Sequence, residues 1–229
     1  MVNLTKNIKE VRQSVIAVGF RHNSTKVTIV GSGFAVGNNA KILSSAHLYD
    51  KLKPEHRNKL VGLAMTKQDS NGLEHYSWFP LKLIKKNEKN DMALFEIENY
   101  EKTLLTSLEL GDSDKAMVGQ DVYFIGFPYA AVLINEGYGI SLIVNKAIIS
   151  NIKLDGQDPK HPRNFIFLDS ISNPGNSGSP LFDLITNKVI GVMAITFRTR
   201  SKTQPELDIR EPMHICAAKP INLAKSLLE

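Results

Sequence analysis

Twelve short apolar runs, separated by turn-forming residues, are the feature that most limits how this chain can fold. Six of them lie between residues 14 and 97 and six between 121 and 218, and stretches such as "NSTK", "GNN" and "KNEKND" divide them. Strands that follow one another every 8–12 residues or so leave no room for the crossover helices of a parallel sheet. The pattern therefore predicts an all-β fold made of two six-stranded antiparallel barrels.

A polar stretch at 105–120 separates the two groups of runs. We therefore expect an N-terminal barrel domain over 1–110 and a C-terminal one over 111–229. Helical spacing of apolar residues predicts a short helix at 4–13. A second one is expected at 220–229, where a proline opens the segment "PINLAKSLLE".

Composition and charge indicate an ordinary globular chain. Hydrophobic residues make up 42% and charged residues 22%, and the formal net charge is +5. The basic residues are scattered and no nucleic-acid-binding motif accompanies them, so no specific nucleic-acid partner is expected. Binding to a nucleic acid through the basic surface stays open as a weaker hypothesis, to be tested by salt-dependent retention on heparin or DNA.

The expected location is the cytoplasm. The one cysteine, Cys216, excludes an intrachain disulfide and favours a reducing compartment. The first twenty residues lack the apolar core of a signal peptide, although a chain whose leader has been removed would look the same. No apolar run approaches the ~20 residues of a membrane span, so no membrane partner is expected.

The stretch "NPGNSGSP" places Ser177 in a tight polar turn between two apolar runs. A serine hydroxyl is a nucleophile only beside a base, with a third group orienting that base and donors ready for the oxyanion. Gly175 lets the backbone turn so that the N–H groups of Gly175 and Ser177 can point into one concavity. Taken alone, such a stretch is more often only a turn.

Two further residues fit the other roles. His47 follows an apolar strand through the small residues of "ILSSAH". A base needs such a position, supported by a rigid strand, near solvent and uncrowded. Asp91, in "KNDMALFEI", is the last polar residue before a strand and can accept the Nδ1–H of a histidine. Asp50 is a rival, but it lies three residues from His47 and is expected to point elsewhere. Each residue alone is more often structural.

Their combination predicts a catalytic cleft. His47, Asp91 and Ser177 follow one another at intervals of 44 and 86 residues. The histidine and the aspartate lie in the first group of strands and the serine in the second. A cleft between two barrels is a common place for an active site.

Seven segments resemble the chymotrypsin-like serine proteases, most of all the bacterial HtrA/Deg-type branch. The resemblance covers about residues 12–228. The motifs that carry it are "GSGFAV", "ILSSAH", "NDMALFEI", "VGQDVYFIGFP", "LDSISNPGNSGSPLFD", "KVIGVMAI" and "AAKPINLAKSLL". It implies a serine endopeptidase acting on protein or peptide substrates, with His47 as general base and acid, Asp91 as the orienting residue and Ser177 as nucleophile. It implies an oxyanion hole from the N–H groups of Gly175 and Ser177, and no metal or cofactor.

The sequence departs from the family pattern at three points. Asn176 stands where digestive members carry the aspartate that pairs with a freshly cut N-terminus, so we expect no proteolytic activation step. Ser179 replaces the usual second glycine of the serine motif. No PDZ domain follows the closing helix, so regulation by such a domain is not expected.

Residue-by-residue matching also implies a first specificity pocket. We expect five residues to form the walls of this pocket: Ile171, Ser172, Ala194, Ile195 and Thr196. No aspartate occupies its base, and Thr196 replaces a glycine that often keeps the mouth open. The resemblance thus implies a preference for small or medium apolar side chains before the cleaved bond.

Alternatives to these readings remain. Cleavage after acidic residues would need His214 or Arg198 to reach the pocket, and Met193 stands where glutamyl endopeptidases carry a histidine. A different class of function is a pseudoprotease that binds peptides without cutting them. A latent protease, inactive until the segment 129–139 orders, lies between the two. The sequence does not predict the oligomeric state.

Overall fold

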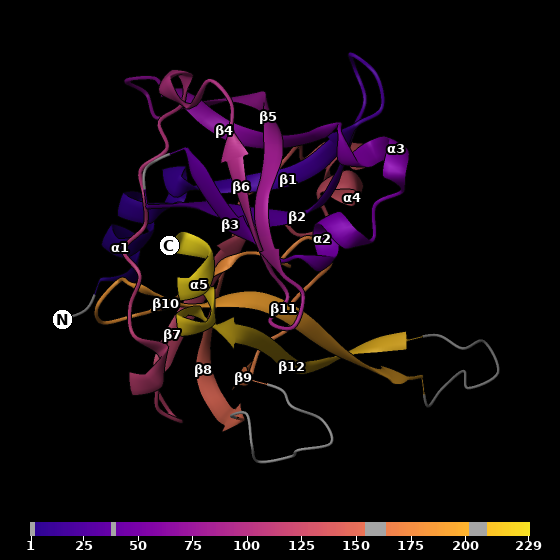
Figure 1. Cartoon of the computed structure of the whole chain (residues 1–229). Helices are drawn as coiled ribbons and strands as arrows, with labels where there is room; N and C mark the ends of the chain where they lie inside the picture. The colour runs from indigo at the N-terminus through magenta and orange to yellow at the C-terminus, as the bar shows by residue number, and fades with distance from the viewer. Residues whose placement is uncertain (1–2, 38–39, 154–163, 202–209) are drawn as a thin grey trace.

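The computed structural model describes residues 3–37, 40–153, 164–201 and 210–229. Within these ranges the chain forms two closed barrels, one above the other in the view of Figure 1. Each barrel has six strands, and all neighbouring strands pair antiparallel. The predicted all-β fold of two six-stranded barrels is therefore confirmed.

The first barrel has the strand order β1-β2-β3-β6-β5-β4. Its strands are β1 (Val15–Arg21), β2 (Val27–Val36), β3 (Lys41–Ser44), β4 (Leu60–Gln68), β5 (Glu74–Asn87) and β6 (Met92–Ile97). Every one of them covers an apolar run of the sequence. Alternating burial along the middle of β5 shows how one face of a strand packs inward while the other meets solvent.

The second barrel repeats this connection pattern, with the order β7-β8-β9-β12-β11-β10. Its strands are β7 (Asp121–Gly126), β8 (Ile143–Lys153), β9 (Phe165–Leu168), β10 (Pro180–Asp183), β11 (Val189–Arg200) and β12 (Arg210–Pro220). The division proposed between residues 110 and 111 falls in the segment that joins β6 to β7.

The helices are short. The helices predicted at the two ends are present as α1 (Leu4–Val11) with a 3₁₀ turn at Arg12–Ser14, and as a 3₁₀ turn at Ile221–Ala224 with α5 (Lys225–Leu228). Three others were not predicted, because four to six residues are too few for a periodic pattern: α2 (His47–Asp50), α3 (Pro54–Arg57) and α4 (Ala130–Asn135). In the described ranges, two further 3₁₀ turns cover Tyr100–Lys102 and Ser113–Lys115. In the described part of the chain, no helix is both long and apolar enough to cross a membrane.

Three apolar clusters form the core. One fills the first barrel around Phe95 and Ile16, and one fills the second around Phe124 and Leu168. The third joins the barrels, since Phe34 of β2 belongs to the same cluster as residues of β7 and β10. Burying apolar surface that two barrels share couples their stability and fixes the line along which they meet.

The N-terminal helix connects the two barrels. The Asn7 amide nitrogen donates to the Leu184 carbonyl of the second barrel at 2.8 Å. A few residues later, Arg12 pairs with both carboxylate oxygens of Glu74 in the first barrel, each at 2.8 Å. Val11, between these contacts, is buried in the shared cluster.

Candidate active site

His47 begins α2, immediately after β3 of the first barrel. Ser44, Ser45 and Ala46, which lead into it, are buried, and their small side chains let the chain turn sharply from strand to helix. His47 itself is half-buried, with about a quarter of its side chain exposed. The ring is thus supported by a strand and still open to solvent, as expected for a base.

Asp91 holds His47 through two hydrogen bonds. The His47 backbone N–H donates to Asp91 Oδ1 at 2.8 Å, and the ring Nδ1 lies 2.7 Å from Asp91 Oδ2. An ionised carboxylate only accepts hydrogen bonds, so the ring proton is on Nδ1. Nε2 then keeps its lone pair and is able to take a proton.

The backbone of Asp91 is in the left-handed region, at φ +53°. Aspartate is one of the few residues besides glycine that tolerates this conformation. The turn before β6 therefore favours an aspartate or asparagine at this position and at the same time aims the carboxylate at His47.

The rival carboxylate, Asp50, is held elsewhere. Its Oδ1 accepts a hydrogen bond from Lys86 Nζ at 2.6 Å, across to the end of β5. Among the described residues, only Asp91 is hydrogen-bonded to the ring of His47.

Ser177 lies in the loop between β9 and β10. Strand β2 of the first barrel holds this loop, because the Ser32 N–H donates to the Ser177 carbonyl at 2.8 Å. On the other side the Gly178 N–H donates to the Met193 carbonyl of β11, also at 2.8 Å. The serine is therefore clamped by strands of both barrels.

The two glycines beside Ser177 are required by the backbone. Gly175 has φ +105° and Gly178 has φ +86°, both in the left-handed range. A Cβ on Gly175 would lie 2.3 Å from the Phe127 carbonyl oxygen, and one on Gly178 would lie 2.1 Å from that of Ser32. No side chain fits at either place.

The peptide before Gly175 is oriented by the second barrel. The Pro174 carbonyl accepts a hydrogen bond from the Tyr129 N–H at 2.8 Å. In a planar trans peptide the C=O and the next N–H point in opposite directions, so the Gly175 N–H points away from Tyr129. Within the described structure, neither this N–H nor that of Ser177 donates to any acceptor. Two free donors thus stand beside the serine.

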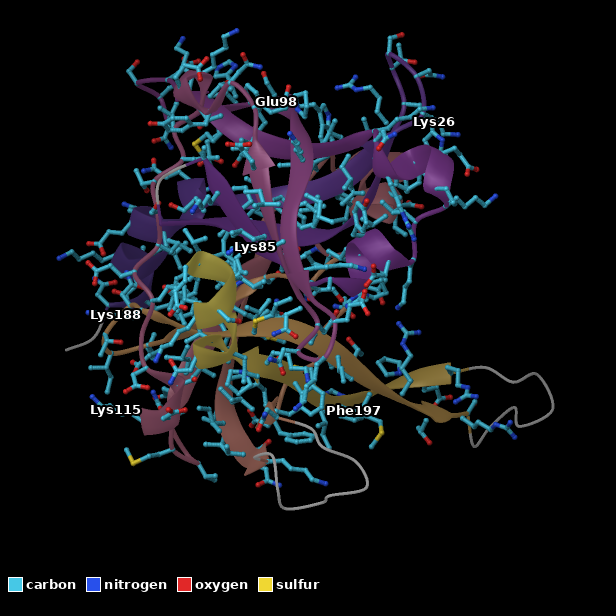
Figure 2. All side chains as sticks on the ribbon, viewed as in Figure 1. Lys26, Lys85, Glu98, Lys115, Lys188 and Phe197 are labelled. Atoms are coloured by element: carbon cyan, nitrogen blue, oxygen red, sulfur yellow. The ribbon has the colours of Figure 1, made fainter. Side chains whose placement is uncertain are left out.

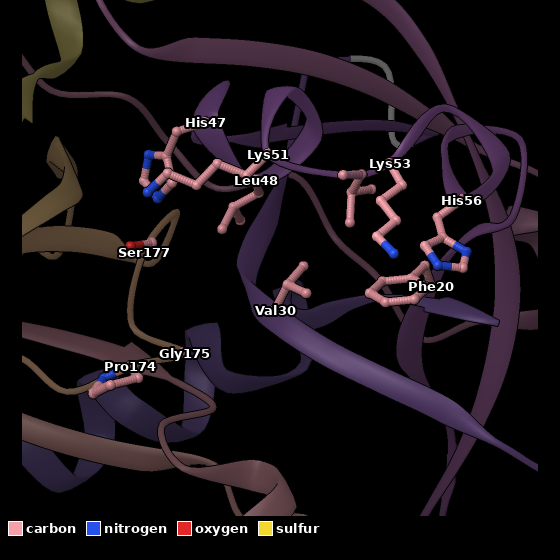
Figure 3. Close-up of a pocket in the computed structure, with 11 residues that line it drawn as sticks. Phe20, Val30, His47, Leu48, Lys51, Lys53, His56, Pro174, Gly175 and Ser177 are labelled. Atoms are coloured by element: carbon pink, nitrogen blue, oxygen red, sulfur yellow. The ribbon is translucent and has the colours of Figure 1, made fainter. Parts of the chain in front are cut away.

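His47, Gly175 and Ser177 line one cavity of about 480 Å³. Figure 3 shows His47 of the first barrel facing Ser177 of the second across this cavity. No hydrogen bond joins the two side chains in the described part of the chain, and such bonds often tighten only when substrate binds. The three predicted residues therefore gather at one place between the barrels.

The five residues expected in the specificity pocket lie outside this cavity. Ile171 and Ser172 follow β9, and the other three, Ala194, Ile195 and Thr196, belong to β11. The Thr196 hydroxyl donates to the Ser172 carbonyl at 2.6 Å and so joins the two segments. The register of β11 shifts at Ala194, a bulge of the kind found beside active sites.

No described contact brings the residues considered for binding an acidic side chain to the expected specificity pocket. Arg198 lies on an exposed part of β11, and His214 lies on an exposed part of β12. Met193 is fully buried in the core of the second barrel. No described contact directs the two basic side chains toward Ser172 or Thr196.

Ser32 was missed by the sequence analysis. Its hydroxyl donates to the Gly175 carbonyl at 2.7 Å and accepts from the Phe127 N–H at 2.9 Å. Beside it, a Cβ on Gly31 would lie 2.8 Å from the Ser177 carbonyl oxygen. The signal was available in "GSG", since glycines within a strand mark a close backbone approach.

Cys216, the one thiol, is not a competing nucleophile. It is fully buried in β12. Burial raises the pKa of its thiol to about 12, with a smaller contribution from repulsion by Asp169. A thiol needs its thiolate form to react, so this side chain is inert at neutral pH. Among the described residues, no group of three or more His, Cys, Asp or Glu is placed to hold a metal ion.

Comparison with known proteins decides the family. The model of the trypsin-like peptidase domain matches residues 31–192, more than half of the chain. This chain belongs to the trypsin-like peptidase family. The resemblance to chymotrypsin-like proteases found in the sequence is thereby confirmed.

Relatives within the trypsin-like peptidases carry the names of serine endoproteases. The "probable periplasmic serine endoprotease DegP-like" of Rickettsia prowazekii is 28% identical over 230 residues, covering 100% of this chain and 36% of the relative. The protein of that name from Halomonas elongata is 29% identical over 198 residues, covering 86% and 35%. "Periplasmic serine endoprotease DegP" of Escherichia coli K12 is 32% identical over 114 residues, covering 50% and 22%. The chain thus spans about a third or less of these relatives.

The expected cytoplasmic location is wrong. These trypsin-like relatives are named periplasmic, which points to a periplasmic or secreted location instead. The cysteine count misled because a single cysteine excludes only an internal disulfide. A chain of this size buries enough apolar surface to fold without disulfides in an oxidising compartment.

Proposed function

We propose that the chain is a serine endopeptidase that cleaves protein or peptide substrates through an acyl-enzyme. Residues 1–110 contribute the base and its orienting carboxylate, and residues 111–229 contribute the nucleophile. The observation that carries the proposal is the Asp91–His47 contact of 2.7 Å beside a cavity that Ser177 also lines.

In the first half of the reaction, Ser177 Oγ attacks the substrate carbonyl carbon and His47 Nε2 takes the hydroxyl proton. The resulting oxyanion accepts hydrogen bonds from the N–H groups of Gly175 and Ser177. The C–N bond then breaks, and His47 returns the proton to the leaving amine. Asp91 stabilises the imidazolium and keeps its Nδ1–H in place.

In the second half, water attacks the ester carbon while His47 takes one of its protons. The bond to Ser177 Oγ breaks, the serine recovers its proton, and the acid product leaves. The two backbone donors serve the oxyanion again. Removing one donor of this kind typically costs on the order of 10²–10³ in rate.

For the residue before the cleaved bond, we propose a preference for small or medium apolar side chains. The hydrogen bond from the Thr196 hydroxyl to the Ser172 carbonyl supports this preference. It holds the Thr196 side chain at the expected mouth of the pocket, where a glycine would leave the mouth wider. Among the described contacts, none brings Arg198 or His214 to these walls, which argues against cleavage after acidic residues through those two side chains. Since a methylene discriminates by only about 1–3 kcal/mol, the preference is soft.

Labelling with a fluorophosphonate tests the proposed nucleophile. The reagent forms a bond from phosphorus to an activated serine oxygen and releases fluoride. We expect the wild-type chain to be labelled and Ser177→Ala to be unlabelled, with mass spectrometry placing the adduct on Ser177. Casein hydrolysis should be lost in the same variant.

Ser179→Ala is the matched control in the same loop. The Ser179 hydroxyl is buried and has no described hydrogen-bond partner, so its removal costs little. Labelling should persist in this variant. Folded wild-type protein that neither reacts with the probe nor cleaves casein would contradict the proposal of an active endopeptidase, and peptide binding by that unreactive protein would favour the peptide-binding alternative.

A further inference from the structure

The cavity beside His47 and Ser177 continues along the first barrel. From Gly175 it passes Leu48 and reaches Phe20 and His56, next to α3 (Figure 3). The catalytic steps proposed above use only its near end. The remainder, which we call the α2–α3 groove, has no role in those steps.

The floor of the α2–α3 groove is apolar. Phe20, Leu48 and Leu52 line it and are each less than a tenth exposed. The Phe20 ring is stacked on the His56 ring, with centroids 4.4 Å apart and planes 27° apart. Such a floor accepts an apolar part of a ligand.

The rim of the groove is basic. Lys51 and Lys53 line the cavity and are exposed residues between α2 and α3. Neither lysine forms an ion pair with any described residue. Of the carboxylates on α2 and α3, Asp50 is bound to Lys86 at 2.6 Å, and Glu55 does not line the groove. Within the described ranges, these two cations at the rim therefore have no paired carboxylate.

The positive charge extends behind the groove. His22 is in edge contact with His56, at 5.4 Å between centroids, and is hydrogen-bonded to Thr28. Desolvation lowers the pKa of His22, and repulsion by His56, Lys26 and Lys59 lowers it further, so the neutral ring is favoured. The positive charge behind the groove therefore comes from Lys26 and Lys59, and such charges attract an anion.

Reaction chemistry indicates which part of a substrate meets this groove. His47 returns its proton to the leaving amine, so the chain after the cleaved bond departs past His47. His47 belongs to α2, and the groove continues from that helix. The residues expected to hold the side chain before the bond lie outside the cavity, at Ile171–Ser172 and on β11.

We propose that the α2–α3 groove selects substrates that carry an acidic side chain within the first three residues after the cleaved bond, through Lys51 and Lys53. An apolar neighbour of that side chain packs on Phe20 and Leu52. The inference rests on the proposed endopeptidase function and adds to it a preference for an acidic leaving segment.

Quenched fluorescent peptides test the preference. The peptides share all residues before the bond and vary three positions after it among Asp, Gln and Lys. We expect kcat/KM for the best Asp peptide to exceed that of its Gln analogue about threefold to tenfold at low salt, the size of two exposed ion pairs. The ratio should approach one in 0.5 M salt, because screening is strong there.

The double variant Lys51→Gln/Lys53→Gln should reduce the Asp/Gln ratio to about one. Lys115→Gln/Lys188→Gln removes the same charge from the second barrel, far from Lys26 in Figure 2 and outside the groove, and should keep the ratio. Equal cleavage of Asp and Gln peptides by the wild-type chain, or a ratio that both double variants lower alike, would overturn the proposal.

Binding separates this proposal from the catalytic one. Ser177→Ala should bind a labelled Asp-containing peptide more tightly than its Gln analogue, and Lys51→Gln/Lys53→Gln in that background should abolish the difference. If cleavage fails while this lysine-dependent binding is found, the groove assignment stands and the endopeptidase falls. If the chain cleaves peptides but shows no preference for acidic residues, the groove proposal is contradicted and the endopeptidase proposal is kept.

Discussion

At the scale of single residues, Asn176 has the most informative surroundings. It precedes the proposed nucleophile and is fully buried, yet neither its Oδ1 nor its Nδ2 has a described hydrogen-bond partner. The hydroxyls of Ser32 and Ser179 lie with Asn176 Oδ1 around Gly126. Among the described residues, none forms an ion pair or hydrogen bond with this side chain, so a carboxylate here would be buried without a described partner.

Asn176→Asp should therefore destabilise the fold. A buried carboxylate without a partner costs about 3 kcal/mol, and its pKa rises in the folded state. The folded chain then holds a proton that the unfolded chain releases, so stability falls as pH rises above about 4, the unfolded pKa of aspartate. Urea denaturation should show that Asn176→Asp lowers the free energy of unfolding more at pH 8 than at pH 5.

Asn173→Asp provides the control in the same loop. Asn173 is half-buried, and water remains to solvate a charge there. Asn173→Asp should lower the free energy of unfolding by less than about 1 kcal/mol at both pH values. If Asn176→Asp lowered the free energy of unfolding equally at pH 5 and pH 8, the new carboxylate would have to be solvated or paired, and the prediction would be wrong.

At the scale of elements, β11 combines a structural role with the proposed specificity. Its first half closes the second barrel, and the bulge at Ala194 turns the strand where it passes the serine loop. Thr196, just beyond the bulge, ties the strand to Ser172. The strand thus positions the proposed pocket wall through its register.

Thr196→Gly should widen the proposed pocket. Removing the side chain opens the mouth and releases the Ser172 carbonyl. We expect kcat/KM for peptides with Phe before the cleaved bond to rise about tenfold relative to peptides with Val, as expected from 1–3 kcal/mol of discrimination. A peptide-library cleavage profile measures this change directly.

Thr199→Gly serves as the comparison on the same strand. Thr199 is exposed, pairs with Glu211 of β12, and lies beyond the proposed pocket. Its cleavage profile should match that of the wild type. Predominant cuts after Glu in the wild type, or identical profiles for the two glycine variants, would contradict the assignment of the pocket wall.

At the scale of the whole molecule, the two barrels share one apolar cluster, and we therefore expect them to unfold as one unit. Phe182 of β10 is fully buried in that cluster and stacks on Tyr123 at 4.7 Å. Partly buried Trp78 of the first barrel packs against the same cluster. The cavity lined by His47 and Ser177, which we propose as the active site, has walls from both barrels, so its geometry depends on this contact.

Phe182→Ala should lower the stability of both barrels together. Truncating a buried phenylalanine costs about 3–5 kcal/mol, or roughly 10 °C in Tm for a chain of this size. Trp78 is the only tryptophan, so its fluorescence reports the first barrel, while circular dichroism reports all strands. The two transitions should coincide and shift together.

Phe95→Ala, in the core of the first barrel alone, calibrates the measurement. It should shift the same single transition by a similar amount. If Phe182→Ala left the fluorescence midpoint in place while circular dichroism showed two steps, the barrels would be independent and the shared cluster would not couple them.

The sequence alone determined the twelve strands, their grouping into two barrels and the identity of His47, Asp91 and Ser177 as candidates. Each of these is encoded locally, by period-two apolar patterns, by turn residues and by the small residues around a functional side chain. The preference for Asp91 over Asp50 also had a local basis, since a residue three positions from His47 lies on the same turn.

Only the tertiary structure decided the rest. The clamp of Ser32 on Gly175, the burial of Asn176, the bulge at Ala194 and the basic α2–α3 groove all join segments that are distant in the chain. Such contacts follow from how two barrels pack, and no local pattern records them. Local periodicity is written in neighbouring residues, whereas the surroundings of a side chain depend on which distant segments fold against it.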